Sequence, residues 1–468
     1  MLHQTGSEIQ KAVLVGLQLP QMTMQEVENS LQELTRLVTT LGHRVVGEVK
    51  QKRSTERAAN VLGDGKLAEL ARWTGGTGKV AGYVEVKKSK AARKWEAEAQ
   101  AASEADAEPE DENSISAETA APGETADLVI VDCDLSPSQL RNLESATGVT
   151  VLDRTGVIIE IFSRHARTKA ARLQVEIARL TYLAPRIREV GGNDSQQGGG
   201  GKGSGETSLE LDKRKIRDRL KELRTELAAI GNEHEVRRAK REQELCVALV
   251  GYTNAGKSSL MRALTGSEIL VADKLFATLD TTIRPLHPES RPKVLVSDTV
   301  GFIKKLPHDL VASFKSTLDE ALHASLLLFV VDCSDPSFRS QLQVTQSVLA
   351  EVGATEAPSL LVLNKKDRLT AEQAASLMSE FPEALMISTR NPEDLQLLRQ
   401  RILQFFEKDM VDTDLFVPYL AQGIVGEVRS KTRVLTETYS DKGVTYKVRA
   451  PEEVVAALTE KIKRTEQK

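Results

Sequence analysis

The chain is poor in aromatic residues and cysteines, and it lacks a long apolar run. Aromatic residues make up 4% of its 468 residues, and its cysteines are Cys133, Cys246 and Cys333. These cysteines are far apart, odd in number and set in or beside strand-like apolar runs. They therefore favour small buried residues in a reducing compartment over disulfides or a metal cluster. No run approaches the roughly 18 apolar residues of a membrane span, and the N-terminus has no apolar signal core. We expect a cytoplasmic monomer.

What is present is the composition of a globular protein. Hydrophobic residues make up 40% and charged residues 28% of the chain, and the formal net charge of −4 gives no indication of a polyanionic partner. A length of 468 residues predicts three or four domains. We expect an N-terminal α/β domain at 1–164, a helical hairpin at 165–243, a nucleotide-binding domain at 244–410 and a small C-terminal α/β domain at 411–468.

The N-terminal domain alternates strand and helix patterns. Short apolar runs lie at 12–17, 45–49, 127–131 and 149–152, and leucines recur at helical spacing between the first two. This alternation predicts a largely parallel sheet. An acidic insertion interrupts it, because Glu96–Glu124 contains no Lys or Arg and almost no large apolar residue. Such a stretch buries too little surface to offset its ordering entropy, so we predict disorder at 85–126.

Two long helical patterns follow. Apolar residues recur in steps of three and four from Leu173 to Ile187, and every seven residues from Leu209 to Ile230. These spacings predict two helices packed along coiled-coil-like seams. A glycine-rich loop at 191–206 joins them. The residues of this loop that would contact a nucleic-acid partner are Lys202, Gly203, Ser204 and Gly205. The outer faces are basic, which is typical either of a salt-bridged solvated surface or of contact with nucleic-acid phosphates.

The most informative motif is Gly251–Ser258, which fits the phosphate-loop pattern G-x-x-x-x-G-K-[ST]. An apolar strand-like run precedes it and a helix start follows it. Backbone N–H groups at the helix N-terminus would bind phosphate, Lys257 would reach the β- and γ-phosphates, and Ser258 would hold Mg²⁺.

Three further motifs follow at strand ends. Asp298-Thr299-Val300-Gly301 supplies a carboxylate for a Mg²⁺-bound water and a glycine amide for the γ-phosphate. Asn364-Lys365-Lys366-Asp367 supplies an aspartate that accepts two hydrogens from guanine, which adenine does not offer, so the motif predicts GTP rather than ATP. The backbone of Ser388-Thr389 would contact guanine O6.

The threonine that senses the γ-phosphate is less constrained. Thr278 lies midway between Ser258 and Asp298, within the run Phe276-Ala277-Thr278-Leu279-Asp280, and Thr282 is the alternative. We select Thr278 as a second Mg²⁺ ligand. The candidate GTP-binding residues are therefore Gly251, Tyr252, Thr253, Asn254, Ala255, Gly256, Lys257, Ser258, Phe276, Ala277, Thr278, Leu279, Asp280, Asp298, Thr299, Val300, Gly301, Asn364, Lys365, Lys366, Asp367, Ser388 and Thr389.

The candidate catalytic residues are Lys257, Thr278 and Gly301. Two further positions, Phe302 and Asn254, differ from the usual GTPase pattern and affect the expected rate of hydrolysis. Phe302 stands where many GTPases have a glutamine that orients water, and phenylalanine makes no hydrogen bond to water, so we predict slow intrinsic hydrolysis. Asn254 replaces a common glycine, and in related GTPases an asparagine here helps to coordinate K⁺. A rigid loop without K⁺ is the alternative.

In these motifs the chain resembles the HflX family, ribosome-associated GTPases of the Obg–HflX group. Upstream runs such as Val151-Leu152-Asp153-Arg154-Thr155 and Gly203-Ser204-Gly205-Glu206-Thr207 also resemble that family. The resemblance implies the four-part α/β architecture above, with a P-loop GTPase domain at its centre. It also implies binding to the large ribosomal subunit near the peptidyl-transferase region and a role in splitting stalled or idle ribosomes.

Two other hypotheses compete with this one. The chain could be a GTPase that gates an RNA-modification or RNA-binding assembly, although it shows no separate constellation for modification chemistry. It could also be an RNA-binding scaffold with a relict nucleotide domain, although neither Lys257 nor Asp367 is replaced.

Overall fold

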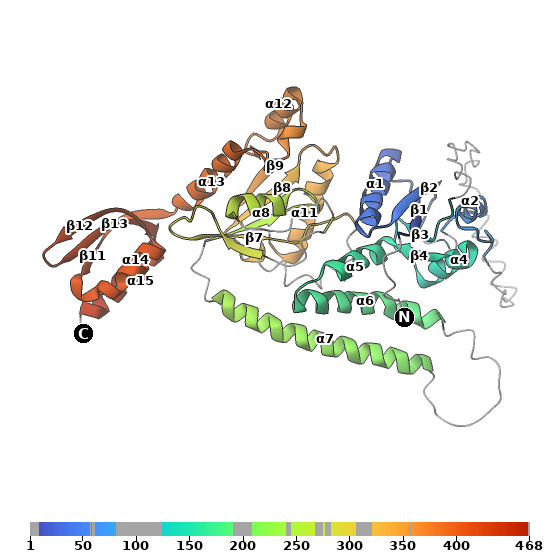
Figure 1. Cartoon of the computed structure of the whole chain (residues 1–468), viewed down its shortest axis with the longest axis horizontal. Helices are drawn as coiled ribbons and strands as arrows, with labels where there is room; N and C mark the ends of the chain where they lie inside the picture. The colour runs from blue at the N-terminus through green and yellow to red at the C-terminus, as the bar shows by residue number, and fades with distance from the viewer. Residues whose placement is uncertain are drawn as a thin grey trace, which may run out of the picture. The chain divides into compact units, whose positions relative to one another are not determined.

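The structure is a computed structural model, and the expected mixed α/β fold class is confirmed (Figure 1). It describes residues 9–56, 58, 61–80, 124–190, 208–239, 245–266, 275–276, 282–305, 321–354 and 357–466. The chain forms two compact units, Met1–Ile158 and Ile159–Lys468. Within the described residues, none of the helices is both long and apolar enough to cross a membrane.

The first unit is built on a parallel sheet, as the alternating pattern predicts. Its four strands run in the order β2-β1-β3-β4. The strands are β1 (Lys11–Gln18), β2 (Arg44–Lys52), β3 (Leu128–Val131) and β4 (Thr150–Asp153). The helices are α1 (Met24–Thr40), α2 (Asp64–Thr74) and α4 (Pro137–Thr147). Helix α1 begins at a capping box in which Thr23 and Glu26 bind each other's backbone N–H groups.

The acidic insertion lies mostly outside the described residues, which resume at Glu124. Its predicted end at residue 126 is wrong. Ala126 is buried, and its N–H donates to Trp73 O at 2.7 Å. The apolar contact of Ala126 with the core stabilises the chain before β3 begins, so the ordered part starts earlier than the composition suggests.

A buried charge network lies at the carboxyl end of β3 and β4. Arg154, the first residue of α5 (Arg154–His165), is 1% exposed. Its guanidinium donates to Asp132 Oδ1 at 2.7 Å and to Glu33, and the Ser30 hydroxyl donates to Asp132 Oδ2 at 2.5 Å. Because a buried cation is costly unless it is paired and hydrogen-bonded, these carboxylates are what allow Arg154 to start the helix inside the fold.

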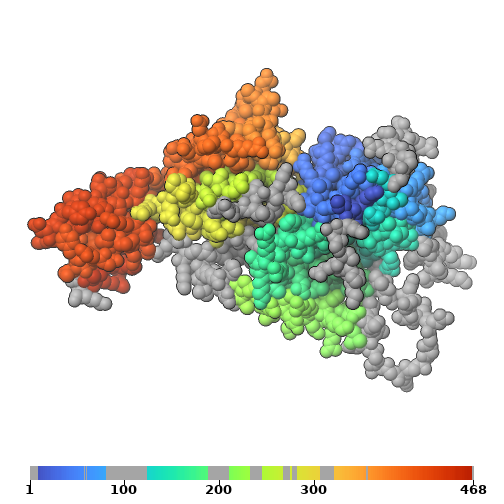
Figure 2. Space-filling view, in the orientation of Figure 1, coloured from blue at the N-terminus to red at the C-terminus, as the bar shows by residue number. Residues whose placement is uncertain are grey.

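The second unit begins with the predicted hairpin. Helices α6 (Lys169–Val190) and α7 (Ser208–Ala239) lie side by side (Figure 1). Leu173, Ile177 and Leu223 are buried between them, which confirms the predicted seam. The glycine-rich loop at 191–206 lies outside the described residues, and so do Lys202, Gly203, Ser204 and Gly205. In the space-filling view α7, in light green, is at the surface (Figure 2).

The nucleotide-binding part contains a sheet in the order β10-β9-β8-β5-β7-β6. Of its described strands, β6 alone runs antiparallel to its neighbour. The strands are β5 (Leu245–Val250), β6 (Thr282–Pro285), β7 (Val294–Asp298), β8 (Leu326–Asp332), β9 (Ser359–Asn364) and β10 (Leu385–Met386). The helices are α8 (Lys257–Thr265), α11 (Phe338–Val352), α12 (Ala371–Glu380) and α13 (Pro392–Glu407). Parallel strands bring their carboxyl ends, which carry the motifs, to one edge.

The C-terminal part is an antiparallel sheet with helices. Strands β12 (Arg433–Ser440) and β13 (Gly443–Pro451) form the predicted hairpin, and α14 (Val425–Lys431) and α15 (Glu452–Glu466) pack with the sheet. Strand β11 (Met410–Pro418) pairs with β13 and was not predicted from the sequence. Its acidic residues obscure the pattern; one of them, Asp412, forms a bidentate ion pair with Arg449 across the strands.

Candidate functional site

The phosphate loop lies between β5 and α8, where the motif predicts it. Gly256 is the N-cap residue of α8, with φ at 98°. A Cβ atom at this position would lie 2.3 Å from Asn364 Nδ2. Both the left-handed backbone and this close approach require glycine. The loop therefore presents its backbone N–H groups at the start of α8 with no side chain at its last turn.

The Lys257 ammonium bonds to the loop's own backbone. Lys257 is 5% exposed, and its Nζ donates to Gly251 O at 3.0 Å and to Tyr252 O at 2.8 Å. Burial lowers the pKa of Lys257 to about 8, against the opposing effect of the nearby Asp298 carboxylate. The ammonium is thus a buried, bonded cation at neutral pH.

Ser258 and Asp298 come together as the two motifs predict. Ser258 Oγ donates to Asp298 Oδ2 at 2.7 Å, and Asp298 is 1% exposed at the end of β7. A hydroxyl and a carboxylate are hard oxygen donors, and Mg²⁺ in phosphate sites takes one or two protein oxygens beside water. The pair fits Mg²⁺. Among the residues with described positions, no cluster of three His, Cys, Asp or Glu side chains offers a metal an alternative.

Gly301 and Phe302 pack directly against the phosphate loop. A Cβ atom on Gly301 would lie 2.8 Å from Thr253 Cγ2 and 3.1 Å from Lys257 Nζ. The Phe302 N–H donates to Gly251 O at 3.1 Å, and its carbonyl accepts the Thr253 N–H at 2.8 Å. The Phe302 ring is buried, so this residue binds the loop through its backbone and presents no polar group to water.

The intervening residues of this motif face inward. Thr299 Oγ1 donates to Leu249 O at 2.7 Å, and Val300 is buried. Tyr252, from the phosphate loop, accepts the Lys304 N–H at its hydroxyl at 2.6 Å. The two segments are therefore held together on both sides of Gly301.

Asn364 and Lys365 join the third motif to the phosphate loop. Asn364 Nδ2 donates to Ala255 O at 2.9 Å, and Lys365 Nζ donates to Asn254 O at 2.8 Å. Lys365 has a φ of 65°, a left-handed conformation that is uncommon outside glycine. These two bonds hold the third motif against the phosphate loop.

Asp332 is a site residue that the sequence analysis did not identify. It ends β8, and its Oδ2 accepts the Lys365 ammonium at 2.7 Å. Its Oδ1 accepts the Ser334 N–H at 3.1 Å, which orients the carboxylate. Its place as the last residue of a buried parallel strand is the signal that could have revealed it, because ligand-binding groups gather at that edge.

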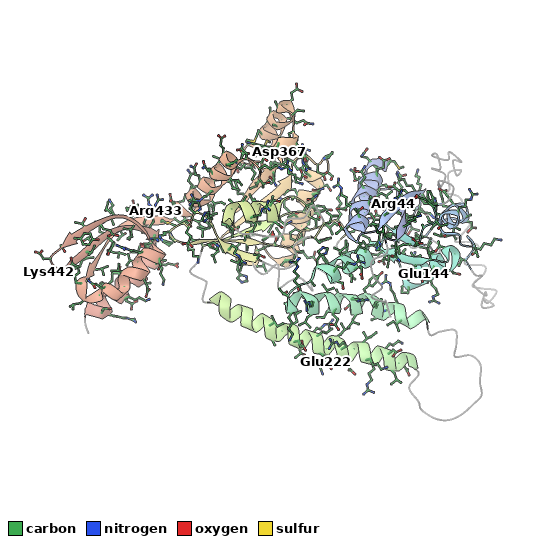
Figure 3. All side chains as sticks on the ribbon, viewed as in Figure 1. Arg44, Glu144, Glu222, Asp367, Arg433 and Lys442 are labelled. Atoms are coloured by element: carbon green, nitrogen blue, oxygen red, sulfur yellow. The ribbon has the colours of Figure 1, made fainter. Side chains whose placement is uncertain are left out.

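Asp367, the predicted guanine-binding residue, lies on the turn after β9 (Figure 3). Ser388 Oγ donates to Asp367 Oδ1 at 2.6 Å, and Arg390 Nη1 lies 3.7 Å from Oδ2. The Ser388 hydrogen bond, and to a lesser extent the charge of Arg390, lower the pKa of Asp367. The carboxylate is therefore ionised and acceptor-only at neutral pH, as recognition of two guanine hydrogens requires.

The structure differs from the prediction at Ser388. Its N–H donates to Asp394 Oδ2 at 2.8 Å, and the Lys366 ammonium binds the other oxygen of Asp394. The backbone of Ser388 is thus occupied within the protein. Of the two residues predicted to reach guanine O6, Thr389 has an N–H without a hydrogen bond to another described residue.

The segment expected to sense the γ-phosphate is described only at its start. Phe276 is buried and has a φ of 57°. The next described residue is Thr282, so Ala277, Thr278, Leu279 and Asp280 lie outside the described part of the chain. The alternative threonine, Thr282, is the first residue of β6 and pairs with Asp298 in the sheet. A residue paired in a strand is poorly suited to change position between the GTP-bound and GDP-bound states.

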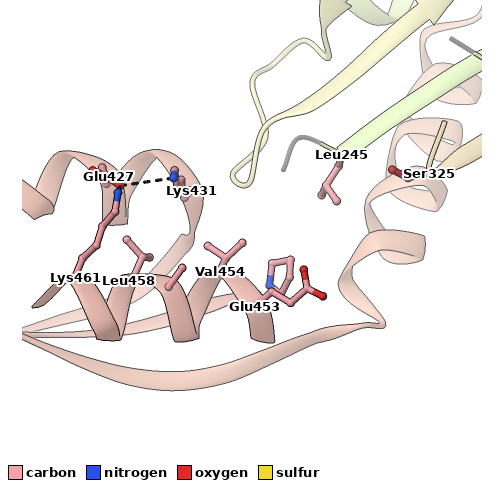
Figure 4. Close-up of a pocket in the computed structure, with 10 residues that line it drawn as sticks. Leu245, Ser325, Glu427, Lys431, Glu453, Val454, Leu458 and Lys461 are labelled. Atoms are coloured by element: carbon pink, nitrogen blue, oxygen red, sulfur yellow. Dashed lines mark hydrogen bonds and ion pairs between the residues drawn. The ribbon is translucent and has the colours of Figure 1, made fainter. Parts of the chain in front are cut away.

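A separate cavity of about 200 Å³ involves α14, α15 and the start of β5 (Figure 4). Lys461 and Lys431 line it, and both form ion pairs with Glu427, at 2.7 and 3.6 Å. Glu427 thus pairs with both lysines, and the cavity has no phosphate-loop residue in its lining. The residues of the nucleotide motifs lie instead at the carboxyl edge of the sheet.

Comparison with known proteins identifies the family. The chain is 55% identical over 463 residues to a GTPase HflX of Gluconacetobacter diazotrophicus, covering 97% of this chain and 98% of that one. It belongs to the HflX family of GTPases. A GTPase HflX of Caldanaerobacter subterraneus subsp. tengcongensis is 35% identical over 99% of this chain. As an HflX GTPase, the protein binds GTP and GDP and hydrolyses GTP.

Three family models match separate parts of the chain. Residues 28–86 and 113–163 match a GTP-binding GTPase N-terminal region, 165–241 a GTP-binding GTPase middle region, and 246–365 a 50S ribosome-binding GTPase. A GTP-binding protein from Sulfolobus solfataricus in complex with GDP is similar over 85% of this chain and 98% of its own, with 22% identity and a TM-score of 0.41.

Replacing Asp332 by asparagine is expected to weaken the binding of GDP and GTP alike. The Lys365 ammonium then loses its carboxylate partner and binds the phosphate loop less firmly. A charge-assisted hydrogen bond of this kind corresponds to a loss of roughly tenfold in affinity. Equilibrium titration with a fluorescent GDP and GTP analogue measures it.

Asp335→Asn is the matched control. Asp335 lies in the same loop and accepts the Ser337 N–H at 2.9 Å. If both substitutions change the dissociation constants equally, loss of the Asp332–Lys365 contact is not the cause of the weaker nucleotide binding.

Proposed function

We propose that this HflX GTPase binds the large ribosomal subunit and couples GTP binding and hydrolysis to the dissociation or rescue of ribosomes. The match of residues 246–365 to a family described as 50S ribosome-binding GTPases carries this proposal. The intact phosphate loop, the Ser258–Asp298 pair and the ionised Asp367 support a working nucleotide site.

The nucleotide would lie along the carboxyl edge of the sheet. The loop from Gly251 to Ser258 would bind the phosphates through its N–H groups, and Lys257 would exchange its carbonyl partners for phosphate oxygens. Asp367 would accept the two guanine hydrogens, and the Thr389 N–H would donate to guanine O6. The walls of the site would be completed by the other residues of the three motifs, namely Tyr252, Thr253, Ala255, Thr299, Val300 and Lys366.

Ser258 and Thr278 would hold Mg²⁺ directly and Asp298 through water. The ion would neutralise charge that develops on the phosphates. Lys257 would stabilise the same charge with its ammonium, and the Gly301 N–H would approach the γ-phosphate. Phe302 is buried and apolar where a water-orienting group would help. We therefore infer slow intrinsic hydrolysis that speeds up on the ribosome.

The hairpin is the proposed ribosome-binding element. Arg219 on α7 forms ion pairs with Glu176 at 2.9 Å and Glu222 at 3.3 Å, whereas Lys221 and Arg224 are exposed and have no ion pair with a described residue. The latter suit contact with rRNA phosphates. Lys202, Gly203, Ser204 and Gly205 would then reach toward the peptidyl-transferase region. A ribosomal partner implies the cytoplasm, where we expect a monomer.

The large-subunit proposal is tested by co-sedimentation. With a non-hydrolysable GTP analogue, the chain should pellet with purified large subunits, and large subunits should raise the GTPase rate. Deletion of 198–205 should remove both effects, because the loop would no longer reach the rRNA, and should leave GDP affinity unchanged.

Asp367→Ala provides the control for nucleotide dependence. This variant should neither bind guanine nucleotides nor pellet in their presence. Wild-type protein that neither pellets nor responds to large subunits would exclude the proposal and leave the RNA-modification alternative standing.

GTP affinity is expected to fall as pH rises above 8. With its pKa lowered to about 8, Lys257 is charged at pH 7 and largely neutral at pH 9 in the nucleotide-free protein. Phosphate raises this pKa, so binding above pH 8 takes up a proton. The affinity at pH 9 should therefore be about tenfold lower than at pH 7. Titrations across this range measure it.

Lys257→Arg is the control for that pH dependence, because its guanidinium stays charged throughout. Titration of the nucleotide itself affects both proteins alike. The same decline in both would show that Lys257 is not its cause.

We also propose that Asn254 binds K⁺ beside the phosphates. Its side chain is exposed on the phosphate loop, and an amide oxygen is a suitable ligand for this cation. Hydrolysis should be faster in KCl than in NaCl at equal ionic strength. Asn254→Gly should remove the difference, and a salt preference that persists in this variant would exclude the role.

A further inference from the structure

Two phenylalanine rings meet in the second unit, and the nucleotide chemistry does not explain this contact. The ring centroids of Phe162 and Phe276 are 4.6 Å apart, with the planes at 73°. Phe162 is fully buried and Phe276 is 3% exposed. An edge-to-face pair of this kind is more favourable than the burial of its area alone.

Phe276 has an unusual backbone for a large side chain. Its φ of 57° lies in the left-handed region, where bulky residues are outliers. Such a conformation persists only when the surroundings impose it. Leu275, its neighbour, is also buried. The packing around the Phe276 ring therefore holds the backbone at this position.

Phe162 lies where α5 leads into the hairpin. Its carbonyl accepts the Ala166 N–H at 2.9 Å, in the last turn of α5. Thr168 Oγ1 then accepts the Ala171 N–H at 3.2 Å at the start of α6. Only a short connection separates Phe162 from the first helix of the hairpin. The ring that holds Phe276 thus belongs to the base of the proposed ribosome-binding element.

We propose that Phe162 is a positioning residue for GTP hydrolysis, which acts by holding Phe276 in its left-handed conformation. Thr278 follows two residues later along the chain, so the backbone of Phe276 would set where the chain enters the segment proposed to bind the γ-phosphate. Coupling between two binding sites is reciprocal. If γ-phosphate binding changes the affinity of the hairpin for its partner, binding of that partner changes the affinity for the γ-phosphate by the same factor. This inference rests on the proposed role of Thr278 and of the hairpin.

Phe162→Leu tests the contact without ribosomes. Leucine keeps the site apolar and removes the ring. The affinity for GDP should stay within twofold, because Asp367 and the phosphate loop are untouched. The affinity for a non-hydrolysable GTP analogue should fall about two- to tenfold, as expected for a buried aromatic pair. The kcat should fall with it.

Phe338→Leu is the matched control. Phe338 is buried and packs edge-on against Phe381, with centroids 6.0 Å apart, in another part of the same unit. This substitution should lower the Tm to a similar extent and leave the ratio of analogue to GDP affinity unchanged. An equal change of that ratio in both variants would mean that general destabilisation is responsible, and would overturn the proposal.

A double-mutant cycle separates the pair from its surroundings. If Phe162 acts through Phe276, Phe162→Leu combined with Phe276→Leu should be no worse than either single variant, whereas independent effects would add. Additive losses in analogue affinity overturn the proposal. Should Phe162→Leu fail to bind GDP because it unfolds, Phe276→Leu alone decides, through the same affinity ratio.

The outcomes distinguish this inference from the proposed function. If wild-type protein neither binds large subunits nor is stimulated by them, the ribosome proposal is excluded. The ratio of GTP-analogue to GDP affinity would still test the role of Phe162. Conversely, large-subunit binding with an unchanged ratio in Phe162→Leu and in Phe276→Leu would overturn the positioning role alone.

Discussion

The phosphate loop and the two segments that pack against it approach so closely that Gly256 and Gly301 have no room for a side chain. The rest of the site depends on this constraint. Asn364 lies so close to Gly256, and Thr253 so close to Gly301, that a single methyl group would collide at either place. The short distances let Asn364 and Lys365 bond to loop carbonyls and let the backbone of Phe302 bond to the loop. Three strand ends thereby form one surface.

The parts of the molecule that could be predicted are those with a local pattern. Strand, loop and helix around Gly251–Ser258 follow from spacing and backbone requirements alone, and so do the parallel sheet of the first unit and the seam of the hairpin. Strand β11 was missed because its stabilising partner, Arg449, lies far along the chain.

Contacts between side chains and other elements explain the differences at the site as well. Asp332 contacts Lys365 across neighbouring strands, and Asp394, six residues along the chain at the start of α13, accepts the N–H of Ser388. The Phe162–Phe276 pair joins residues more than a hundred positions apart. Composition and periodicity contain no information about which distant side chains meet, so such contacts appear only in the folded chain. The basic face of α7 keeps its two interpretations: Arg219 forms ion pairs with Glu176 and Glu222, whereas Lys221 and Arg224 are exposed.

The polar groups of the nucleotide site already bond to one another. Lys257 binds loop carbonyls, Ser258 binds Asp298, and Ser388 binds Asp367. Each incoming group must therefore replace a bond that exists, and the net gain from replacing any single one is small. A stray phosphate or a lone metal ion gains little here. In the proposed binding mode, a guanine nucleotide with Mg²⁺ would replace all of these bonds together, so the site would discriminate by the number of simultaneous exchanges rather than by the strength of any one.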